Sequence, residues 1–314
     1  MPPPYVSRRL AAIDLGTNTV RLLVAEARPG GTWAALAQDQ RVTRLGEGVA
    51  ETGRLGREPM TRTAAVVAEY VARARRMGAE RIRVVATSAV RDAANGRQFV
   101  SELAVRTSVE IEVVSGEEEA RLTVRGILAG LPGAPDPLLA FDVGGGSTEF
   151  MLARGGRMVH AASLPLGVVP LTERYPFPHP VDWPRYLAME AEIRTVLRAG
   201  LPVELGTAPG ATLVGTAGTV TTLAALDLGL DVYAADRVQG HRLERPAIEA
   251  LMERLGALTV AERAALPCLE PGRADVILAG VAIVRAALEV TGARAVLVSD
   301  WGLREGIMAE AVQP

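Results

Sequence analysis

A short pattern occurs twice in this chain, about a domain's length apart. Each copy is an apolar strand that ends in aspartate, then a turn of glycine and hydroxyl residues, then a second apolar strand. The copies are Leu10-Ala-Ala-Ile-Asp-Leu-Gly-Thr-Asn-Thr19 and Leu138-Leu-Ala-Phe-Asp-Val-Gly-Gly-Gly-Ser-Thr148. A repeat of this spacing predicts two similar halves rather than a solenoid of short units. Because both turns need to approach one ligand, we expect the halves to face each other across a cleft.

The rest of the chain alternates between strand patterns and helix patterns. In the first half we expect strands at 10–14, 20–27, 33–44, 81–86 and 109–114, and helices at 59–77, up to about 106, and at 117–129. In the second half we expect strands at 138–142, 150–153, just before 215 and at 295–299, and helices at 182–199, up to about 228, at 274–290 and up to about 311. Such alternation predicts an α/β fold with a mixed sheet. The Gly- and Pro-rich stretch 130–137 is the best domain boundary, so a first domain is expected over 1–129.

Composition excludes several classes of function. The formal net charge is −2, so no global basic field would attract nucleic acid or a membrane surface. All 34 basic residues are arginine. A chain without lysine has no Walker-type phosphate-binding lysine and cannot form a Schiff base. The single cysteine, Cys268, excludes disulfides within the chain and fits a reducing compartment. Since no segment has the pattern of a signal peptide or a membrane span, we expect a cytoplasmic protein.

The two repeated turns are typical of phosphate binding. Glycine allows a tight turn at a strand end, and its backbone N–H groups can then form a nest for an anion. Asp14 and Asp142 end the two strands and could hold a hydrated Mg²⁺ against the phosphates. Hydroxyl groups at Thr17, Thr19, Ser147 and Thr148 add hydrogen-bond donors. One Asp-Gly turn alone could be an ordinary hairpin, but two copies after matching strands favour a phosphate site.

Three further segments could contribute to such a site. Gly215-Thr-Ala-Gly-Thr219 is a third small-residue turn between a strand and a helix, although close helix packing also favours small residues. In Ser115-Gly-Glu-Glu-Glu119, the acids could cap a helix, or one could orient an attacking water; periodicity does not choose among the three. Arg91 stands where a helix begins and could bind phosphate bidentately, the alternative being a salt bridge with Asp92. Arg21 and Arg304 are weaker candidates of the same type.

Seven segments, in this order, resemble the motifs of the exopolyphosphatase/guanosine pentaphosphate phosphohydrolase (Ppx/GppA) family of the actin–hexokinase–Hsp70 superfamily. They are Ala12–Leu22, Ala86–Asp92, Ser115–Arg121, Asp142–Glu149, Gly215–Thr219, Gly272–Val276 and Val298–Gly306. Together they extend over nearly the whole chain, which makes the resemblance far more specific than any one glycine-rich turn.

The resemblance implies the short form of the family, with two ribonuclease-H-like (actin-like ATPase) domains around a central cleft. Domain I would cover 1–129, with the final helix 303–314 packing back onto it, and domain II would cover 130–302. Long members of the family carry additional C-terminal helical domains, and since the sequence ends at Pro314 we expect this protein to lack them.

Matching the family's motifs assigns roles to individual residues. The resemblance implies Glu119 as the catalytic carboxylate and Arg91 as the arginine that grips phosphate. Asp142 and Glu149 match acids associated with metal and water, and Asp14 joins them as a candidate ligand of Mg²⁺. The candidate substrate-binding residues are Gly16, Thr17, Asn18, Thr19, Arg21, Gly144, Gly145, Gly146, Ser147, Thr148, Gly215, Thr216 and Gly218.

The activity that the resemblance implies is Mg²⁺-dependent hydrolysis of the terminal phosphoanhydride of inorganic polyphosphate, by in-line attack of water. Guanosine pentaphosphate offers the same terminal bond and is the alternative substrate. A second alternative is an actin-like ATP-binding or sugar-kinase-type protein, which would not need the Glu119 and Arg91 segments. A third is a sensor that binds guanosine penta- or tetraphosphate without turnover. Neither nucleic acid nor a membrane is expected as a partner, and a homodimer is compatible with the family.

Overall fold

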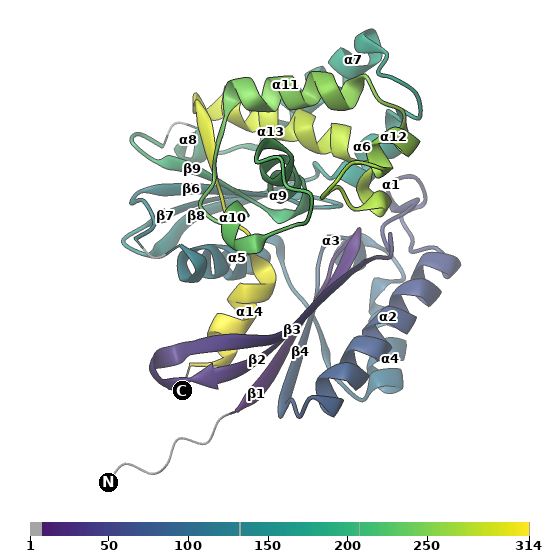
Figure 1. Ribbon diagram of the computed structural model, residues 1–314. Helices are drawn as coiled ribbons and strands as arrows, with labels where there is room; N and C mark the ends of the chain where they lie inside the picture. The colour runs from purple at the N-terminus through teal and green to yellow at the C-terminus, as the bar shows by residue number, and fades with distance from the viewer. Residues whose placement is uncertain (1–7, 132, 207, 314) are drawn as a thin grey trace. The chain divides into compact units, whose positions relative to one another are not determined.

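The computed structural model describes residues 8–131, 133–206 and 208–313. The chain divides into two compact units. Unit 1 combines the N-terminal segment up to Ala129 with the segment from Leu303 onward, and unit 2 is Gly130–Gly302 (Figure 1). In the described part of the chain, no helix combines the length and the apolar character that crossing a membrane requires.

Unit 1 is built on a five-stranded mixed sheet in the order β3-β2-β1-β4-β5. Strands β1, β2 and β3 form an antiparallel meander, whereas β4 and β5 run parallel to β1. The strands are β1 (Arg9–Leu15), β2 (Thr19–Arg28), β3 (Thr32–Val42), β4 (Arg81–Ala86) and β5 (Ile111–Val113). The helices are η1 (Pro29–Gly31), α1 (Val49–Thr52), α2 (Arg57–Arg76), α3 (Ser88–Asp92), α4 (Gly96–Thr107), α5 (Gly116–Gly130) and α14 (Leu303–Ala311).

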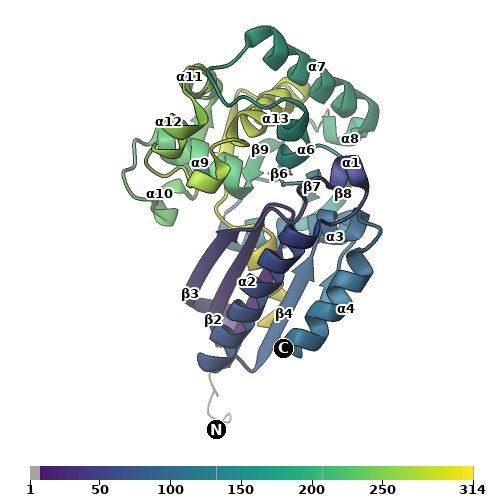
Figure 2. The same ribbon diagram turned by 90° about the vertical axis from the view of Figure 1, so that its right-hand side faces the viewer.

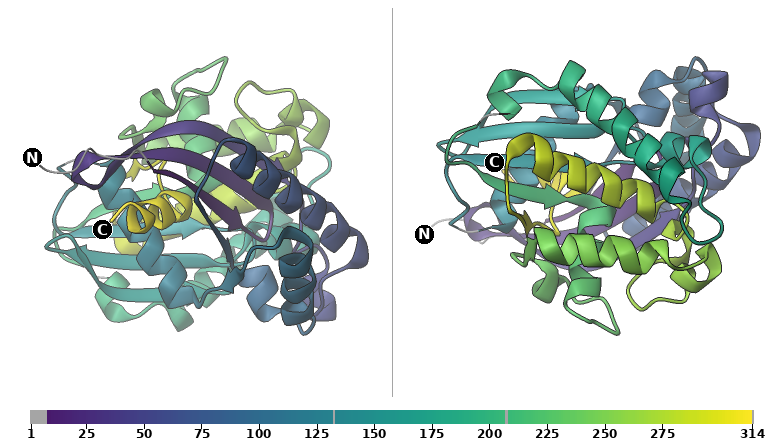
Figure 3. Two further views of the ribbon diagram at one scale, coloured as in Figure 1. Left: turned by 90° about the horizontal axis from the view of Figure 1, so that it is seen from below. Right: turned by 90° about the horizontal axis from the view of Figure 1, so that it is seen from above.

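Alternation along β1 gives unit 1 a core on each face of its sheet, because successive strand residues point to opposite faces. Ile13 and Leu15 belong to the cluster that includes residues of α2 and α4, which cover that face (Figure 2). Leu10 and Ala12 belong to the opposite cluster, which includes residues of α5 and α14. The final helix α14 therefore packs on the sheet of unit 1, beside β1 (Figure 3, left).

Unit 2 repeats this topology with one additional strand. Its sheet has the order β10-β11-β9-β6-β7-β8. Strands β6, β7 and β8 form an antiparallel meander, β9 and β11 run parallel to β6, and β10 is added antiparallel at the edge. The strands are β6 (Leu138–Val143), β7 (Thr148–Arg154), β8 (Arg157–Leu164), β9 (Thr212–Thr216), β10 (Arg242–Glu244) and β11 (Ala295–Val298). The helices are α6 (Val168–Arg174), α7 (Trp183–Gly200), α8 (Val203–Gly206), α9 (Ala217–Asp227), α10 (Ala235–Val238), α11 (Arg245–Gly256), α12 (Val260–Ala264), η2 (Pro271–Arg273) and α13 (Ile277–Thr291).

One large apolar core holds unit 2 together. Phe141 and Val143 of β6 belong to the same buried cluster as nearly all of α13, including Ile277 and Val281. Helices α7, α11 and α13 cover this side of the sheet (Figure 3, right). The expectation of an α/β fold made of two related halves with mixed sheets is confirmed, since strands β8-β7-β6-β9-β11 correspond one by one to β3-β2-β1-β4-β5.

Candidate functional site

The first repeated turn joins β1 to β2 and is closed by its own backbone. Asp14 is the penultimate residue of β1, and the N–H of Gly16 donates to the carbonyl of Thr19 at 3.1 Å. A Cβ atom at Gly16 would lie 2.9 Å from that carbonyl oxygen, so a side chain here would force the turn open. The turn is thus a tight hairpin whose glycine is required by the close approach of the backbone.

The second repeated turn joins β6 to β7 and closes in the same way. The N–H of Gly144 donates to the carbonyl of Ser147 at 2.9 Å, and a Cβ atom at Gly144 would lie 2.8 Å from that oxygen. The turn is therefore a hairpin, and a hairpin of this kind can also present its backbone N–H groups to a phosphate. The two interpretations of the sequence are compatible. The sequence repeat corresponds to a repeat of backbone hydrogen bonding.

The carbonyl groups of both turns are held by segments behind them. In unit 1, the carbonyl of Thr17 accepts from the N–H of Gly46 at 2.9 Å, and the carbonyl of Asn18 accepts from two further N–H groups. In unit 2, the carbonyls of Gly144 and Gly145 accept from the first N–H groups of α6 at 3.2 and 2.9 Å. Because these oxygens would repel an anion, their engagement favours presentation of the N–H groups to a phosphate.

Two glycines that sequence reasoning missed make this backing possible. A Cβ atom at Gly46 would lie 2.2 Å from the Thr17 side chain, and one at Gly167 would lie 2.3 Å from the backbone of Gly145 and Gly146. Both stand where the chain returns behind a turn. Each lies beyond the third strand of its unit, so only the three-dimensional repeat relates Gly46 to Gly167.

The hydroxyl groups of the turns have different partners. Thr17 Oγ1 accepts from the N–H of Ala89 at 3.1 Å and so joins the first turn to the start of α3. Thr148 is fully buried, and its hydroxyl donates to the carbonyl of Leu166 at 2.6 Å. A hydroxyl has one hydrogen to donate, so in this conformation Thr148 secures the turn rather than donating to a phosphate. Asn18 Oδ1 is buried and makes no hydrogen bond with any described residue, which fits a polar ligand or water at this turn.

Arg91 and Glu119 form an ion pair within unit 1. Nη1 of Arg91 donates to Glu119 Oε2 at 2.9 Å and to the carbonyl of Val114 at 3.0 Å. The Arg91 side chain is 22% exposed and that of Glu119 is 12% exposed. Charges this poorly solvated interact more strongly than a surface pair, and both remain within reach of a ligand. The alternative pairing with Asp92 is also present, with a longer separation of 3.5 Å between Arg91 Nε and Asp92 Oδ1.

The start of α5 separates the roles of its acids. Ser115 caps the helix, because its hydroxyl oxygen accepts from the N–H of Glu118 at 3.1 Å. Glu118 is bound through both carboxylate oxygens by Arg121, whereas Glu119 contacts Arg91. Sequence periodicity could not make this distinction, because it depends on an arginine contributed by a different helix.

The candidate metal ligands differ between the two turns. Asp142 stands directly opposite Glu149 across β6 and β7, and opposed residues of an antiparallel pair share one face. Glu149 is 1% exposed and accepts from the Ser163 hydroxyl at 2.7 Å. The corresponding partner of Asp14 in unit 1 is Arg21, so the first turn has one acid and one base where the second has two acids. Residues 8–131, 133–206 and 208–313 contain no group of three His, Cys, Asp or Glu side chains placed to hold a metal ion.

An oxygen-only set of two carboxylates nevertheless fits Mg²⁺, which binds through one or two carboxylates and keeps several waters. The Asp142–Glu149 pair has this character.

The third turn, between β9 and α9, combines packing with strain. Gly215 is required by the core, because a Cβ atom there would lie 2.7 Å from Val296 and 2.9 Å from Phe141. Thr216 donates through its hydroxyl to the carbonyl of Trp301 at 3.2 Å. Ala217 has a φ of 69°, a left-handed conformation that a residue with a Cβ atom adopts at an energetic cost and that often marks a functional site.

Arg273 is a site candidate to which sequence reasoning assigned no role. Its guanidinium group lies against Gly218, where a Cβ atom would stand 2.0 Å from Nη1. The residue is 8% exposed, and its Nε lies 3.4 Å from Glu270 Oε2. The signal in the sequence was a single arginine in the matched segment Gly272–Val276. Gly218 is therefore the residue that allows a buried cation to lie on the third turn.

Arg304, a further arginine candidate, lies at the start of α14 and helps to hold unit 1 together. It donates to the carbonyl of Leu22 at 3.3 Å, to Gln38 at 3.0 Å and to Glu305. These contacts join α14 to β2 and β3.

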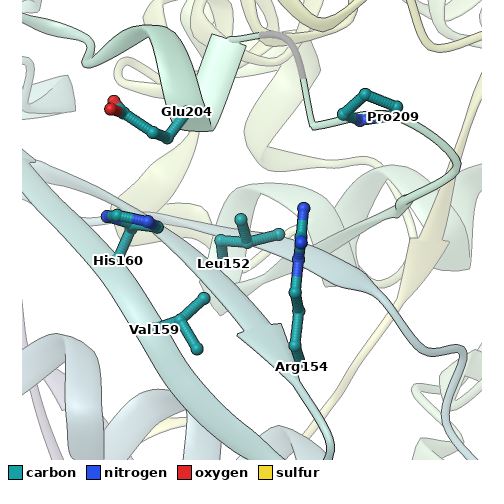
Figure 4. A pocket seen from close by; sticks show the side chains of 6 residues that line it. All are labelled: Leu152, Arg154, Val159, His160, Glu204 and Pro209. Carbon is teal, nitrogen blue, oxygen red and sulfur yellow. The ribbon is translucent and has the colours of Figure 1, made fainter.

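A separate pocket of about 430 Å³ lies on unit 2 (Figure 4). Leu152 and Arg154 of β7 line it, with Val159, His160, Glu204 and Pro209. It is at the opposite end of β7 from Thr148, so it is distinct from the second turn.

Comparison with known proteins finds relatives that match nearly the whole chain. The model of the Ppx/GppA phosphatase family matches residues 23–313. Exopolyphosphatase 2 of Mycobacterium tuberculosis is 36% identical over 314 residues, which cover 95% of this chain and 97% of that protein. An exopolyphosphatase-like protein of known structure has a TM-score of 0.89 at 30% identity, covering 97% of this chain and 98% of that one. The Ppx/GppA enzyme of Aquifex aeolicus has a TM-score of 0.80 at 32% identity, covering 97% and 100%. With its repeated glycine turns and its Arg91–Glu119 pair, this chain belongs to the Ppx/GppA phosphatase family of enzymes.

Proposed function

We propose that the protein is an exopolyphosphatase that releases orthophosphate from the end of inorganic polyphosphate. The observation that carries this proposal is the Arg91–Glu119 pair, a cation and a carboxylate held together near the first glycine turn. The similarity to proteins named exopolyphosphatase supports polyphosphate as the substrate. Phosphoryl transfer needs positive charge on the phosphoryl oxygens and an oriented nucleophile, and this pair supplies one group for each need.

In the proposed mechanism, Glu119 orients a water molecule so that the water oxygen faces the terminal phosphorus, and it accepts a proton from that water as the oxygen attacks. A new P–O bond forms as the bridging P–O bond breaks, and the shortened polyphosphate leaves with the bridging oxygen. Arg91 stabilises the charge on the phosphoryl oxygens. Arg91 holds the Glu119 carboxylate in one orientation before substrate arrives, which lowers the entropic cost of orienting the water.

The glycine turns are proposed to bind the phosphates next to the reacting group. The turns of both units close identically and have their carbonyls engaged from behind, which supports a common role on one anionic chain end. Arg273, against Gly218, would add a cation from unit 2. In this proposal neither unit has the full set of groups, because the carboxylate for water comes from unit 1 and the paired acids come from unit 2.

We propose that Asp142 and Glu149 hold Mg²⁺, with Asp14 as a further ligand. When bound, the ion would neutralise charge on the phosphate oxygens. The pairing of the two acids across β6 and β7 supports this assignment. Removal of Mg²⁺ with a chelator should abolish phosphate release, and re-addition should restore it. Asp142→Asn should raise the Mg²⁺ concentration needed for half-maximal activity.

The decisive experiment is a phosphate-release assay with Mg²⁺ on short polyphosphate, long polyphosphate and guanosine pentaphosphate in parallel. Release from polyphosphate without ATP supports the proposal and excludes a kinase-type function. Release from guanosine pentaphosphate alone would replace the substrate, and tight binding without release from any of the three would indicate a sensor. We further propose that the protein forms a homodimer and is cytoplasmic; light scattering on the same preparation tests the first proposal, and cell fractionation tests the second.

A further inference from the structure

One arginine of unit 2 has no exposed surface. Arg263, in the short helix α12, is 0% exposed. Its guanidinium group donates to five backbone carbonyls: Leu255 at 3.0 Å, Leu258 at 2.8 Å, Phe177 at 3.0 Å, His179 at 3.4 Å and Ala274 at 3.2 Å. None of these partners is a carboxylate. Burial lowers the pKa of Arg263, although the charge of Asp275 opposes that shift.

Burial of a cation costs desolvation free energy, and apolar residues of similar volume often give a folded protein of equal stability. What an apolar side chain cannot do is fix several carbonyl groups at once. Arg263 joins three stretches that are distant in sequence, at 177–179, 255–258 and 274. Arg263 therefore fixes the backbone positions of these three stretches relative to one another.

Ala274 connects Arg263 to the third turn. Ala274 directly follows Arg273, whose guanidinium group lies on Gly218. Arg273 itself ends a single 3-10 turn, closed by the bonds from Arg273 N–H to Glu270 and from Ala274 N–H to Pro271. One turn of this kind has little intrinsic stability, so its position depends on contacts made by its ends. The bond from Arg263 to the Ala274 carbonyl is such a contact.

We infer that Arg263 is a positioning residue that holds Arg273 on the third turn and thereby sets the affinity of that turn for phosphate. The inference rests on the proposed function for its kinetic consequence. The structural part of the inference, that Arg263 fixes the segment 271–276, does not depend on which substrate the protein takes. A residue that merely stabilised the core would change the melting temperature and leave phosphate affinity unaltered.

A double-mutant cycle with Arg273 tests the inference. Arg263→Lys keeps the charge but offers an ammonium group with fewer donors and no planar fork. We expect it to lower kcat/KM for polyphosphate by about fivefold or more, chiefly through KM, within the usual range of coupling between residues that act through one another. In an Arg273→Gln background the same substitution should change kcat/KM by less than about twofold.

A matched control separates positioning from general destabilisation. Arg285 of α13 pairs with the buried Glu190 of α7 in the same unit and lies outside the segment 271–276. Arg285→Lys should lower the melting temperature without a change in KM. Equal effects of Arg263→Lys in both backgrounds, or a loss of melting temperature with an unchanged KM, would overturn the inference.

Hydrogen exchange provides a readout that does not depend on turnover. Arg263→Lys should speed exchange at the amides of 271–276 relative to the rest of unit 2, and it should do so even if polyphosphate proves not to be the substrate. Should Arg263→Lys fail to fold, hydrogen exchange can instead be measured on the single variant Glu119→Gln, with and without polyphosphate. Protection is then expected at both 255–263 and 271–276, and protection confined to 215–219 would contradict the link.

Discussion

At the scale of single residues, the candidate site depends on which of several similar side chains faces which partner. Three consecutive glutamates lie in the first turn of α5, yet Glu118 is bound by Arg121 and Glu119 by Arg91. The helix dipole favours all three acids equally in the first turn, so propensity and capping do not distinguish them. The distinction arises from β4 and α3, which place Arg91 beside one position of the helix and not the next.

Glu119→Gln should lower kcat for phosphate release by about 10²- to 10⁴-fold, the usual contribution of a general base. The amide cannot accept a proton from water, but it preserves the shape of the side chain and can still accept a hydrogen bond from Arg91. Polyphosphate affinity should be retained or slightly increased, because Arg91 loses a competing negative charge. Stopped-flow phosphate release and equilibrium binding measure the two effects separately.

Glu118→Gln is the matched control, since it removes the neighbouring charge and weakens only the pair with Arg121. We expect it to change kcat by less than about threefold, as suits a half-exposed pair. Equal losses in the two variants, or normal turnover in Glu119→Gln, would remove Glu119 from the proposed mechanism.

Gly218 allows a second test at the scale of a residue. In Gly218→Ala the new methyl group would stand 2.0 Å from Nη1 of Arg273, so the guanidinium group has to move off the third turn. We expect KM for polyphosphate to rise by about three- to tenfold with a small change in melting temperature, because a flexible side chain can yield where backbone cannot. Steady-state kinetics and thermal unfolding check both parts.

Gly206→Ala serves as its control, because the nearest atom to a Cβ there is a Leu201 methyl at 3.8 Å. An unaltered KM in Gly218→Ala would mean that Arg273 takes no part in substrate binding.

The sequence predicted site residues that belong to a local pattern and missed those whose position depends on packing between distant segments. A strand end and a turn are built from local patterns alone, as at Asp14, Gly16, Asp142 and Gly144. Arg273 does not, since its position beside Gly218 depends on how η2 packs against α9. The role of Thr148 was equally hidden, because its hydroxyl partner, Leu166, follows an intervening strand.

At the scale of elements, periodicity predicted the buried strands and long helices and missed the marginal ones. The edge strand β8 has one buried residue and carries an arginine, a histidine and several small residues, so it lacks an apolar alternation. The expected helix ending near Arg106 is instead two helices, α3 and α4, interrupted around Asn95, whose side chain bonds to the backbone of Leu55 at 2.8 Å. Amphipathic spacing in α11, with Ile248, Leu251 and Leu255 buried, was present in the sequence but not used.

The equivalence of the two hairpin turns leads to a prediction about them as elements. Gly16→Ala and Gly144→Ala should each break the bond that closes the turn, because the added Cβ would press on the carbonyl that accepts it. We expect each to cost about 1–3 kcal/mol of stability, as overpacking does. Each should also lower kcat/KM by at least about tenfold, since the turn N–H groups would be misdirected.

Urea unfolding and phosphate release measured on both variants test this equivalence. Gly56→Ala, whose Cβ would meet only Pro59 at 3.2 Å, is the control for adding a methyl group in unit 1. If only one of the two turn variants loses activity, the turns do not share a role.

At the scale of the whole molecule, the two ends of unit 1 are joined by charge as well as by apolar packing. Glu310 of α14 accepts from Arg83 of β4 and Arg121 of α5, each at 2.6 Å, and lies 3.4 Å from Arg125. A Cβ atom at Gly306 would lie 1.8 Å from the Leu122 carbonyl, so α14 and α5 are in backbone contact. The last helix of the chain thereby supports the helix that carries Glu119, a relation that local sequence patterns do not contain.

Glu310→Gln should therefore destabilise the protein in a pH-dependent way. Burial alone would raise the pKa of Glu310, but hydrogen bonds from Arg83 and Arg121 outweigh burial and hold its pKa below the ordinary value. A carboxylate with a depressed pKa contributes stability above its unfolded-state pKa of about 4.3, and loses it as pH falls through the folded-state value. We expect a loss of about 1–2 kcal/mol at pH 7, between that of an exposed pair and a buried one.

Urea unfolding from pH 7 down to about pH 3.5 should show the two proteins converging as the pH falls, because the native carboxylate becomes protonated and resembles the amide. Glu112→Gln is the matched control: it also pairs with Arg83, but its side chain is 45% exposed, so its loss should be smaller at every pH. A constant difference between wild type and Glu310→Gln across this range would show that α14 is held by packing, with no contribution from the charge of Glu310. In that case α14 would support the helix that carries Glu119 through apolar packing and through the close contact between Gly306 and Leu122.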